Sequence, residues 1–206
     1  MRVAIIGGTG SFGRALAERI AALGEDVVIG SRDASRAEEI AAVLGVDGAT
    51  NEQAVEGADL VILAVRSNAA LDTARELASA IGSKPLLSVA SSLEFSDKGV
   101  LPGQHGHSLA EHIAEIVEAP VAAGLQTLAA VHLTGTDLPD EDVLVCGDDP
   151  AAKEPSLELA GRLVAGRAID AGPLENARAL EGMTAVILNV NRRYKIYAGI
   201  RLTGFP

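Results

Sequence analysis

Residues 3–13 read VAIIGGTGSFG, a short apolar run that ends in a glycine-rich turn. Gly8, Gly10 and Gly13 have the spacing G-x-G-x-x-G, and a helix-forming stretch over 14–23 follows directly. In this motif Gly8 makes the tight turn, Gly10 lets a pyrophosphate approach the backbone, and Gly13 lets the helix pack closely on the strand. The free N–H groups at the start of the helix then face the anion. The segment therefore predicts a strand, turn and helix that bind a dinucleotide.

The end of the next apolar run indicates which dinucleotide this is. Residues 27–32 read VVIGSR, and Arg36 lies one turn further on. NAD sites usually carry Asp or Glu here to bind the ribose 2′-hydroxyl. Ser31 and Arg32 offer a hydroxyl and a guanidinium to a 2′-phosphate instead, and Arg36 can add a second cation. The sequence thus predicts NADP(H), with the alternative that Arg36 is a solvated surface residue.

The composition excludes several classes of partner. The chain has 206 residues and a formal charge of −11, which argues against nucleic acid and anionic membranes. No apolar run approaches the roughly 18 residues of a membrane-spanning helix, and the first strand begins so early that we expect no signal peptide. The single cysteine, Cys146, excludes an internal disulfide and favours a cytoplasmic location.

Strand and helix patterns alternate along the chain, which predicts an α/β fold. We expect a Rossmann-type, doubly wound, mostly parallel sheet with a small C-terminal extension. The proposed division is an NADP-binding part over 1–125 and a smaller part over 126–206, with a soft boundary or one continuous domain. Strands are expected at 2–7, 26–30, 48–50, 58–65, 85–90, 127–133, 142–147 and 167–171. Helices are expected at 11–23, 33–43, 51–56, 69–81, 109–118, 155–165 and 176–193, with a long loop over 91–108.

Side chains suited to acid–base or nucleophilic catalysis are scarce. The chain has no Tyr-x-x-x-Lys pair and no G-x-S-x-G motif. His105, His107 and His112 suggest a metal site only as a minor alternative to solvated histidines, so we predict no metal. Cys146, inside an apolar run, is most simply a buried core thiol. His132 ends an expected strand, where strand ends face the ligand crevice, although a core histidine is the alternative.

This scarcity favours one kind of hydride transfer. Reduction of a carbonyl creates an alkoxide that needs a proton donor nearby. Transfer between the carbons of two conjugated rings spreads the charge over the acceptor ring, so that positioning and backbone N–H donors suffice. We therefore predict no catalytic side-chain acid or base and a second cofactor as the partner of NADP(H).

The chain resembles the NADPH-dependent coenzyme F420 reductases, also called F420H2:NADP oxidoreductases. The resemblance rests on segments along nearly the whole chain. These are Met1–Ala4, Gly7–Gly10, Val28–Arg32, Asp72–Arg75, Cys146–Asp149, Asp170–Leu174 and Ile187–Asn189. The family implies hydride transfer between NADP(H) and the deazaflavin F420.

The family also implies a set of binding residues. Gly8, Thr9, Gly10, Ser11 and Phe12 would hold the pyrophosphate. Ser31, Arg32 and Arg36 would hold the 2′-phosphate, and Ser67 and Leu71 would lie beside the nicotinamide half. His132, Thr136 and Ala198 would lie at the deazaflavin. The chain departs from the family pattern at Arg66, where relatives carry Pro, and over 133–136, where relatives are more apolar.

The basic C-terminal region and the competing functions remain open at this point. Arg192, Arg193, Lys195 and Arg201 could meet the phosphodiester and oligoglutamate of F420, or form a solvated helix end or a dimer contact. We expect a homodimer through the last helix. The alternative functions are an NADPH-dependent reductase of a flavin or a small imine or carbonyl, and a non-enzymatic NADP-sensing protein.

Overall fold

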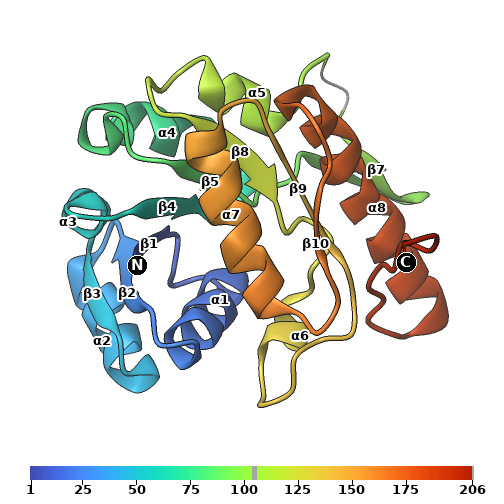
Figure 1. Cartoon of the computed structure of the whole chain (residues 1–206), viewed down its shortest axis with the longest axis horizontal. Coiled ribbons are helices and arrows are strands. Elements are labelled where there is room, and N and C mark those ends of the chain that lie inside the picture. Colours follow the sequence, from blue (N-terminus) through green and yellow to red (C-terminus); the bar gives the residue numbers. More distant parts are fainter. Residues whose placement is uncertain (104–105, 206) are drawn as a thin grey trace.

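An eight-stranded sheet forms the centre of the computed structural model, which describes residues 1–103 and 106–205 (Figure 1). The strand order is β10-β9-β8-β5-β4-β1-β2-β3, and neighbours are parallel except for β8 with β9. The predicted Rossmann-type, mostly parallel sheet is confirmed. The strands are β1 (Arg2–Ile6), β2 (Asp26–Ser31), β3 (Asp47–Thr50), β4 (Leu60–Leu63), β5 (Leu86–Ser88), β8 (Val121–Gly124), β9 (Val143–Gly147) and β10 (Ala168–Asp170).

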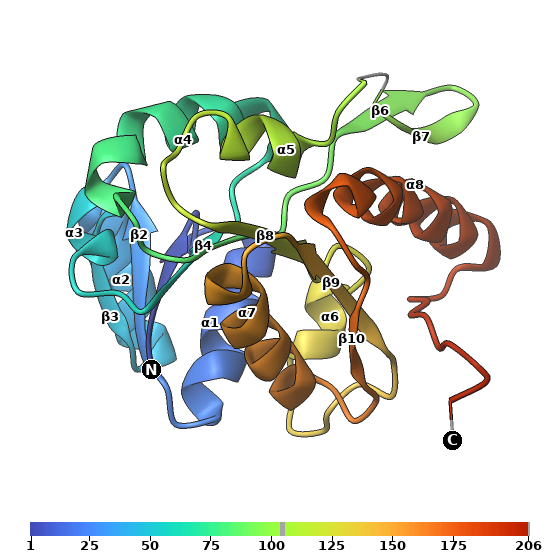
Figure 2. The same ribbon diagram turned by 45° about the horizontal axis from the view of Figure 1, so that its top comes forward.

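Helices cover both faces of this sheet because its strands are apolar on both sides. Val3 and Ile5 of β1 belong to one buried cluster, and Ala4 and Ile6 belong to the other, as the alternation of side chains along a strand requires. Figure 2 shows α4 and α5 on one side of the sheet and α1, α6 and α7 on the other. The helices are α1 (Ser11–Ala22), α2 (Ala34–Leu44), α3 (Asn51–Val55), α4 (Ser67–Ile81), α5 (Leu109–Ala114), α6 (Ala130–Leu133), α7 (Pro150–Leu163) and α8 (Ala177–Tyr194).

The prediction of a strand over 127–133 was wrong. The strand is β8, earlier in the chain, and His132 lies in the single turn of α6. The sequence of β8 is VAAG, whose alanines and glycine have low strand propensity, so that only its neighbours in the sheet identify it. Leu125 follows with a φ of +67°, which ends the strand before the apolar run that had suggested it.

The long loop predicted over 91–108 contains a hairpin. Its strands are β6 (Leu93–Ser96) and β7 (Gly99–Pro102), which pair only with each other. The hairpin lies beside α8 in both views (Figures 1 and 2), and β7 contacts that helix extensively. An isolated two-stranded hairpin is marginally stable, so packing on α8 explains why the short strands form.

In the C-terminal half, two details of the helices differ from the prediction. Helix α7 begins at Pro150 rather than 155, because Asp149 caps it and proline suits the first turn, while Pro155 is tolerated inside it. A 3-10 turn, η1 (Leu174–Asn176), precedes α8. The sheet continues through β8 and β9 across the proposed boundary at 125, so the two-part division stays a prediction. No helix of the described residues is long and apolar enough to span a membrane.

Candidate functional site

The glycine loop after β1 is built by three different constraints. Gly7 has a φ of +85° and makes the turn, one residue before the position predicted from the motif. A Cβ on Gly8 would lie 2.5 Å from the Cβ of Ile29, so this glycine lets the loop sit against β2. A Cβ on Gly13 would lie 2.5 Å from the carbonyl oxygen of Gly7, which makes glycine necessary for the close packing of α1.

Gly10 has a different surrounding, which fits a ligand. It precedes α1 with ordinary extended dihedral angles, and it is exposed. The nearest atom that a Cβ there would meet is the carbonyl oxygen of Gly7 at 3.4 Å. Gly10 therefore satisfies no packing need within the chain. Its missing side chain leaves the backbone open to a group that approaches from outside, as pyrophosphate binding requires.

Two uncapped helix N-termini meet at this loop. No side chain caps α1, which follows Gly10, or α4, which follows Arg66. Helices α6 and α8 also lack a side-chain cap, whereas α2, α3, α5 and α7 are capped by Asp33, Thr50, Ser108 and Asp149. Uncapped N-termini leave backbone N–H groups and a positive dipole end available to an anion. Both termini line one cavity of about 280 Å³, formed by Gly10, Ser11, Phe12, Ala64, Val65, Arg66 and Val89.

Arg66 is a residue that sequence reasoning treated only as a departure from the family. The structure places it at the start of α4, exposed, on the wall of the loop cavity. No ion pair engages its guanidinium among the described residues. The available signal was its position three residues after the strand 60–63, because carboxyl ends of parallel strands meet at the ligand edge of the sheet. Thr9 lies in the same loop, where its carbonyl accepts a hydrogen bond of 3.0 Å from Arg14 Nε.

The residues predicted for the 2′-phosphate lie together at the end of β2. Ser31 is the last residue of the strand, and its Oγ accepts a hydrogen bond of 3.2 Å from the Asp33 amide. Arg32 and Arg36 are exposed, and no carboxylate of the described part of the chain forms an ion pair with either. Asp33 lies between them, but its carboxylate accepts from the Arg36 amide as the cap of α2. Both guanidinium groups are thus available to an anion.

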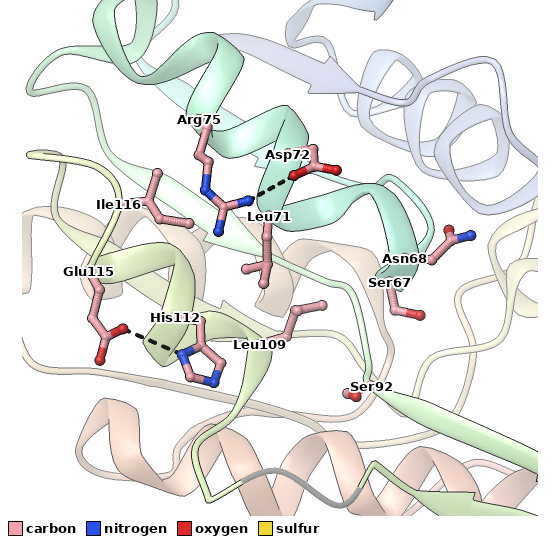
Figure 3. A pocket seen from close by; sticks show the side chains of 10 residues that line it. All are labelled: Ser67, Asn68, Leu71, Asp72, Arg75, Ser92, Leu109, His112, Glu115 and Ile116. Atoms are coloured by element: carbon pink, nitrogen blue, oxygen red, sulfur yellow. Dashed lines mark hydrogen bonds and ion pairs between the residues drawn. The ribbon is translucent and has the colours of Figure 1, made fainter.

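Ser67 and Leu71 lie on α4 beside a second cavity of about 550 Å³, which is lined by residues of α4 and α5 (Figure 3). Ser92, after β5, lines it as well. Its polar wall holds an ion pair of Arg75 with Asp72 at 2.7 Å, and His112 Nδ1 lies 3.4 Å from Glu115 Oε2. Ser67 follows Arg66 directly, so the loop cavity and this one border the same N-terminus of α4.

His132 lies in a third hollow, of about 280 Å³, formed by α6 and the C-terminal segment. Its Nδ1 lies 2.7 Å from Oε1 of Glu141, and its ring meets that of Tyr197 edge-on at 6.4 Å. Glu141 is buried, and burial raises the pKa of its carboxyl. The second oxygen of Glu141 has no hydrogen-bond partner in the described residues. Sequence reasoning missed Glu141, which carries no motif.

The two other residues predicted at the deazaflavin lie apart from the loop cavity. Thr136 is exposed, and its carbonyl accepts a bond of 3.4 Å from Arg19, whose buried guanidinium also binds the carbonyls of Leu133, Gly135 and Asp137. The Ala198 amide donates to Asn191 Oδ1 at 2.7 Å. The structure thus brings together the residues over 8–12, and it places His132, Thr136 and Ala198 on other elements.

A buried carboxylate, also missed by sequence reasoning, holds α8 beside the end of β5. Glu181 accepts hydrogen bonds from the Ser92 amide at 3.1 Å and the Ala110 amide at 3.2 Å, and burial raises its pKa. One turn later, the Thr184 hydroxyl lies 2.9 Å from Ser91 Oγ and donates to the Gln126 carbonyl at 2.9 Å. These bonds fix the N-terminal half of α8 against the segments that follow β5 and β8.

The remaining titratable candidates have structural surroundings. Cys146 is buried, as predicted, and burial raises the pKa of its thiol to about 12. His107 Nδ1 lies 3.0 Å from Glu111 Oε1, and this contact raises the pKa of the imidazole. His105 lies outside the described residues. No group of three or more potential ligands is arranged around a metal position in the part of the chain that the structure describes.

Known proteins match the chain from end to end. An F420-dependent NADP reductase of Methanothermobacter thermautotrophicus is 36% identical over 224 aligned residues, covering 100% of this chain and 96% of the relative. The chain belongs to the F420-dependent NADP reductase family. A family model described as NADP oxidoreductase, coenzyme F420-dependent, matches residues 2–92. The predicted membership in this family is therefore confirmed.

Solved structures of other proteins share the fold of this chain. A crystal structure from Arthrobacter sp. FB24, provisionally described as an F420-dependent NADP reductase, superposes with a TM-score of 0.88 at 26% identity. It covers 99% of this chain and 100% of the other. A Streptomyces aurantiacus imine reductase has a TM-score of 0.64 at 23% identity, covering 95% of this chain and 62% of the other, which shows a shared fold alone.

Proposed function

We propose that this protein transfers hydride between NADP(H) and coenzyme F420. The observation that carries this function is the 36% sequence identity, over the full length of the chain, with an F420-dependent NADP reductase. The geometry agrees with it, because an open glycine loop, two uncapped helix N-termini and two unpaired guanidinium groups suit a dinucleotide with a 2′-phosphate. The two substrates supply the redox chemistry, in which nicotinamide C4 and deazaflavin C5 exchange the hydride.

The proposed tasks of the chain are binding and orientation. The loop residues Gly8, Thr9, Gly10, Ser11 and Phe12 bind the pyrophosphate together with Arg66. Ser31, Arg32 and Arg36 bind the 2′-phosphate. Ser67 and Leu71 lie beside the nicotinamide half, and His132, Thr136 and Ala198 serve the deazaflavin.

We further propose that no side-chain acid or base is essential. Two observations support this. The Cys146 thiol has its pKa raised to about 12, so it does not ionise near neutral pH. Glu181, a carboxyl with a raised pKa, is bonded to backbone amides of the chain itself. Rates of hydride transfer should then vary little with pH wherever the fold is intact.

An absorbance assay tests the proposed function. NADPH should bleach the long-wavelength band of oxidised F420 when the protein is present, and NADH should do so poorly. Activity on free flavin or on an imine without activity on F420 would favour the alternative reductase. Tight NADPH binding with no hydride acceptor would favour the sensing protein.

Replacing Arg32 by Ala should raise the KM for NADPH roughly tenfold or more. The reason is the loss of a charge-assisted hydrogen bond to the 2′-phosphate, worth about 1.5–3 kcal/mol. NADH lacks that phosphate, so the KM for NADH should change little. The measurement is KM for both dinucleotides at saturating F420. An equal loss with both would mean that Arg32 does not bind the phosphate.

The proposed oligomer is a homodimer that pairs the hairpin and α8. Phe95 on the hairpin is 77% exposed, and Val186 on α8 is 60% exposed. Val186 lies on the same helix face as Gly182 and Asn189, both of which meet the hairpin. Exposed apolar groups gathered on adjoining elements mark interaction surfaces. A cytoplasmic location, supported by the single unpaired thiol of Cys146, also stays a prediction.

Replacing Phe95 and Val186 by Glu should convert the dimer to a monomer, because each subunit would bury two like charges at the interface. Light scattering after size exclusion measures the mass. Val43→Glu is the matched control, since Val43 is also exposed, and α2, which carries it, lies on the opposite side of the molecule from α8 (Figure 1). A wild-type monomer, or a variant that stays dimeric, would contradict the proposed surface.

A further inference from the structure

A buried guanidinium, that of Arg19, joins two segments that lie 114 to 118 residues apart in the chain. Arg19 belongs to the last turn of α1, the helix that begins at the glycine loop, and it is only 5% exposed. Its nitrogens donate to four carbonyls of residues 133–137, which we call the clamped loop. The acceptors are the carbonyls of Leu133 (from Nε, 3.0 Å), Gly135 (from Nη2, 3.0 Å), Thr136 (from Nη1, 3.4 Å) and Asp137 (from Nη2, 2.9 Å).

The charge of Arg19 is balanced by these carbonyl dipoles. No carboxylate pairs with it in the part of the chain that the structure describes. A buried charge is costly unless hydrogen bonds replace its hydration, and bonds from a charged donor are stronger than those between neutral groups. The donors of a guanidinium also point in fixed directions within one plane. Arg19 therefore fixes both the distance and the path of the clamped loop relative to α1.

The clamped loop has few other contacts that could fix it. Its residues from Gly135 onward are exposed, and Gly135 has a φ of +95°. Over the described residues, the backbone groups of 135–138 form no hydrogen bond with other backbone groups. Only Leu133, at the start of the loop, is buried in the core. The position of the loop thus depends mainly on the Arg19 guanidinium.

The segment that leads into the clamped loop borders the proposed site. Strand β8 is parallel to β5, so residues 125–133 begin at the same edge of the sheet as Val89, which lines the loop cavity. Phe12, on the opposite wall of that cavity, packs against the buried cluster that contains Leu125, Leu128 and Leu133. Helix α6, the end of this segment, contacts α1 (Figure 1). Arg19 therefore holds one wall of the site to the helix that starts at the pyrophosphate loop.

We propose that Arg19 is a positioning residue for hydride transfer, an inference that rests on the proposed function. By holding α6 and the clamped loop against α1, it sets where the acceptor ring lies relative to the nicotinamide. The two reacting carbons must approach to about 3–3.5 Å, and a displacement of about 1 Å can slow such a step by roughly a hundredfold. The residues proposed for the 2′-phosphate, Ser31, Arg32 and Arg36, lie on β2 and α2 and do not depend on this clamp.

Arg19→Ala should lower the rate constant of hydride transfer roughly tenfold or more and leave the dissociation constant of NADPH unchanged. The rate constant is measured in a single turnover, by the loss of F420 absorbance after protein loaded with NADPH is mixed with saturating F420. A first-order rate constant does not depend on how much of the protein is folded, so a purely structural defect would change the amplitude and not the rate. Titration with NADPH gives its dissociation constant.

The vacated carbonyls provide a second readout. Millimolar guanidinium ion, far below denaturing concentrations, should restore part of the rate in Arg19→Ala and have no effect on the wild type. Arg162→Ala is the matched control. Arg162 lies on α7 and also holds α1 with a guanidinium, through the Leu23 carbonyl at 2.8 Å and the Glu25 carboxylate, but it does not contact the clamped loop. Its removal should lower stability and leave the rate constant unchanged.

Gly135→Ala disturbs the clamped loop without removing a charge. An added Cβ would meet no atom within 4 Å, so the effect comes from the positive φ alone. This variant should also slow hydride transfer, by a smaller factor, with NADPH affinity unchanged. If Arg19→Ala does not fold, Arg19→Lys takes its place, because it keeps the charge but loses the planar array of donors.

The outcomes separate this inference from the proposed function. A wild-type rate constant in both the Arg19 variant and Gly135→Ala would overturn the positioning role, as would an equal loss in Arg162→Ala, while the proposed function would stand. A loss of NADPH affinity as large as the loss of rate would also overturn it, because the clamp would then act on the dinucleotide. If the wild-type protein transfers no hydride to F420, the proposed function itself fails and the inference fails with it.

Discussion

Replacing Asp142 by Asn should lower the free energy of unfolding by about 3 kcal/mol, at the lower end for a broken buried ion pair because Arg167 keeps access to water. Asp142 is fully buried. It accepts bonds from the Arg167 amide at 3.0 Å, Arg167 Nε at 3.1 Å and Nη2 at 2.6 Å, and from the Leu202 amide at 2.8 Å. These bonds hold the C-terminal segment to the start of β9. Urea unfolding with an unchanged slope measures the loss.

Asp140→Asn is the control for this prediction. Asp140 is two residues earlier and pairs with Arg201, but its side chain is 80% exposed. An exposed ion pair contributes about 0–1 kcal/mol, so this variant should remain close to the wild type. Equal effects of the two substitutions would contradict the role given to burial.

The Asp142 carboxylate should make the free energy of unfolding depend on pH in the acidic range. The hydrogen bonds from Arg167 hold the pKa of Asp142 well below its usual range. A lowered folded pKa means that the unfolded chain binds the proton more readily, so the contribution is present above about pH 4 and is lost as the pH falls further. The difference in stability between wild type and Asp142→Asn should shrink in that range.

Gly13→Ala should destabilise the fold and abolish most NADPH binding. The added Cβ would lie 2.5 Å from the Gly7 carbonyl oxygen and 2.8 Å from the Gly8 Cα, both backbone atoms that cannot rotate away. Overpacking costs about 1–3 kcal/mol, which exceeds the gain of about 1 kcal/mol from replacing glycine inside a helix. The loop must shift, so we expect at least a roughly tenfold loss of affinity, equivalent to about 1.4 kcal/mol.

Gly10→Ala separates binding from folding. Its dihedral angles suit alanine, and the added Cβ would meet nothing nearer than 3.4 Å. The thermal midpoint should therefore stay close to that of the wild type, while the methyl group obstructs the pyrophosphate and weakens NADPH binding. Calorimetric titration well below both midpoints gives the affinities. Unchanged binding by Gly10→Ala would contradict the place proposed for the pyrophosphate.

The N-terminal half could be predicted because its signals are local. β1, α1 and β2 lie within a residue or so of their expected bounds, and the strand at 60–63 was recognised from its continuous apolar run. Farther along the chain, β8 was not predicted, because its VAAG sequence forms a strand only through its pairing with β5 and β9. The hairpin over 93–102 was not predicted, because it is stabilised by α8, which lies nearly 90 residues later in the sequence.

The candidate site divides in the same way. Ser31, Arg32 and Arg36 could be found because the end of β2 and the start of α2 are adjacent in the chain. Arg66 was present in the sequence, but its place beside the glycine loop depends on how the start of α4 packs there. Glu141 gave no signal at all, since its contact with His132 depends on how α6 and the start of β9 pack.

The sequence by itself determined the dinucleotide loop, its preference for a 2′-phosphate and the family of the chain. A tight turn followed by a helix N-terminus is made by hydrogen bonds within a few residues, and its glycines are required by contacts inside the same unit. Only the tertiary structure decided that Lys98 meets Arg192 and Arg193, and that Asp142 is buried with Arg167. Such pairs depend on packing between distant segments, where burial and neighbouring charge decide what a side chain does.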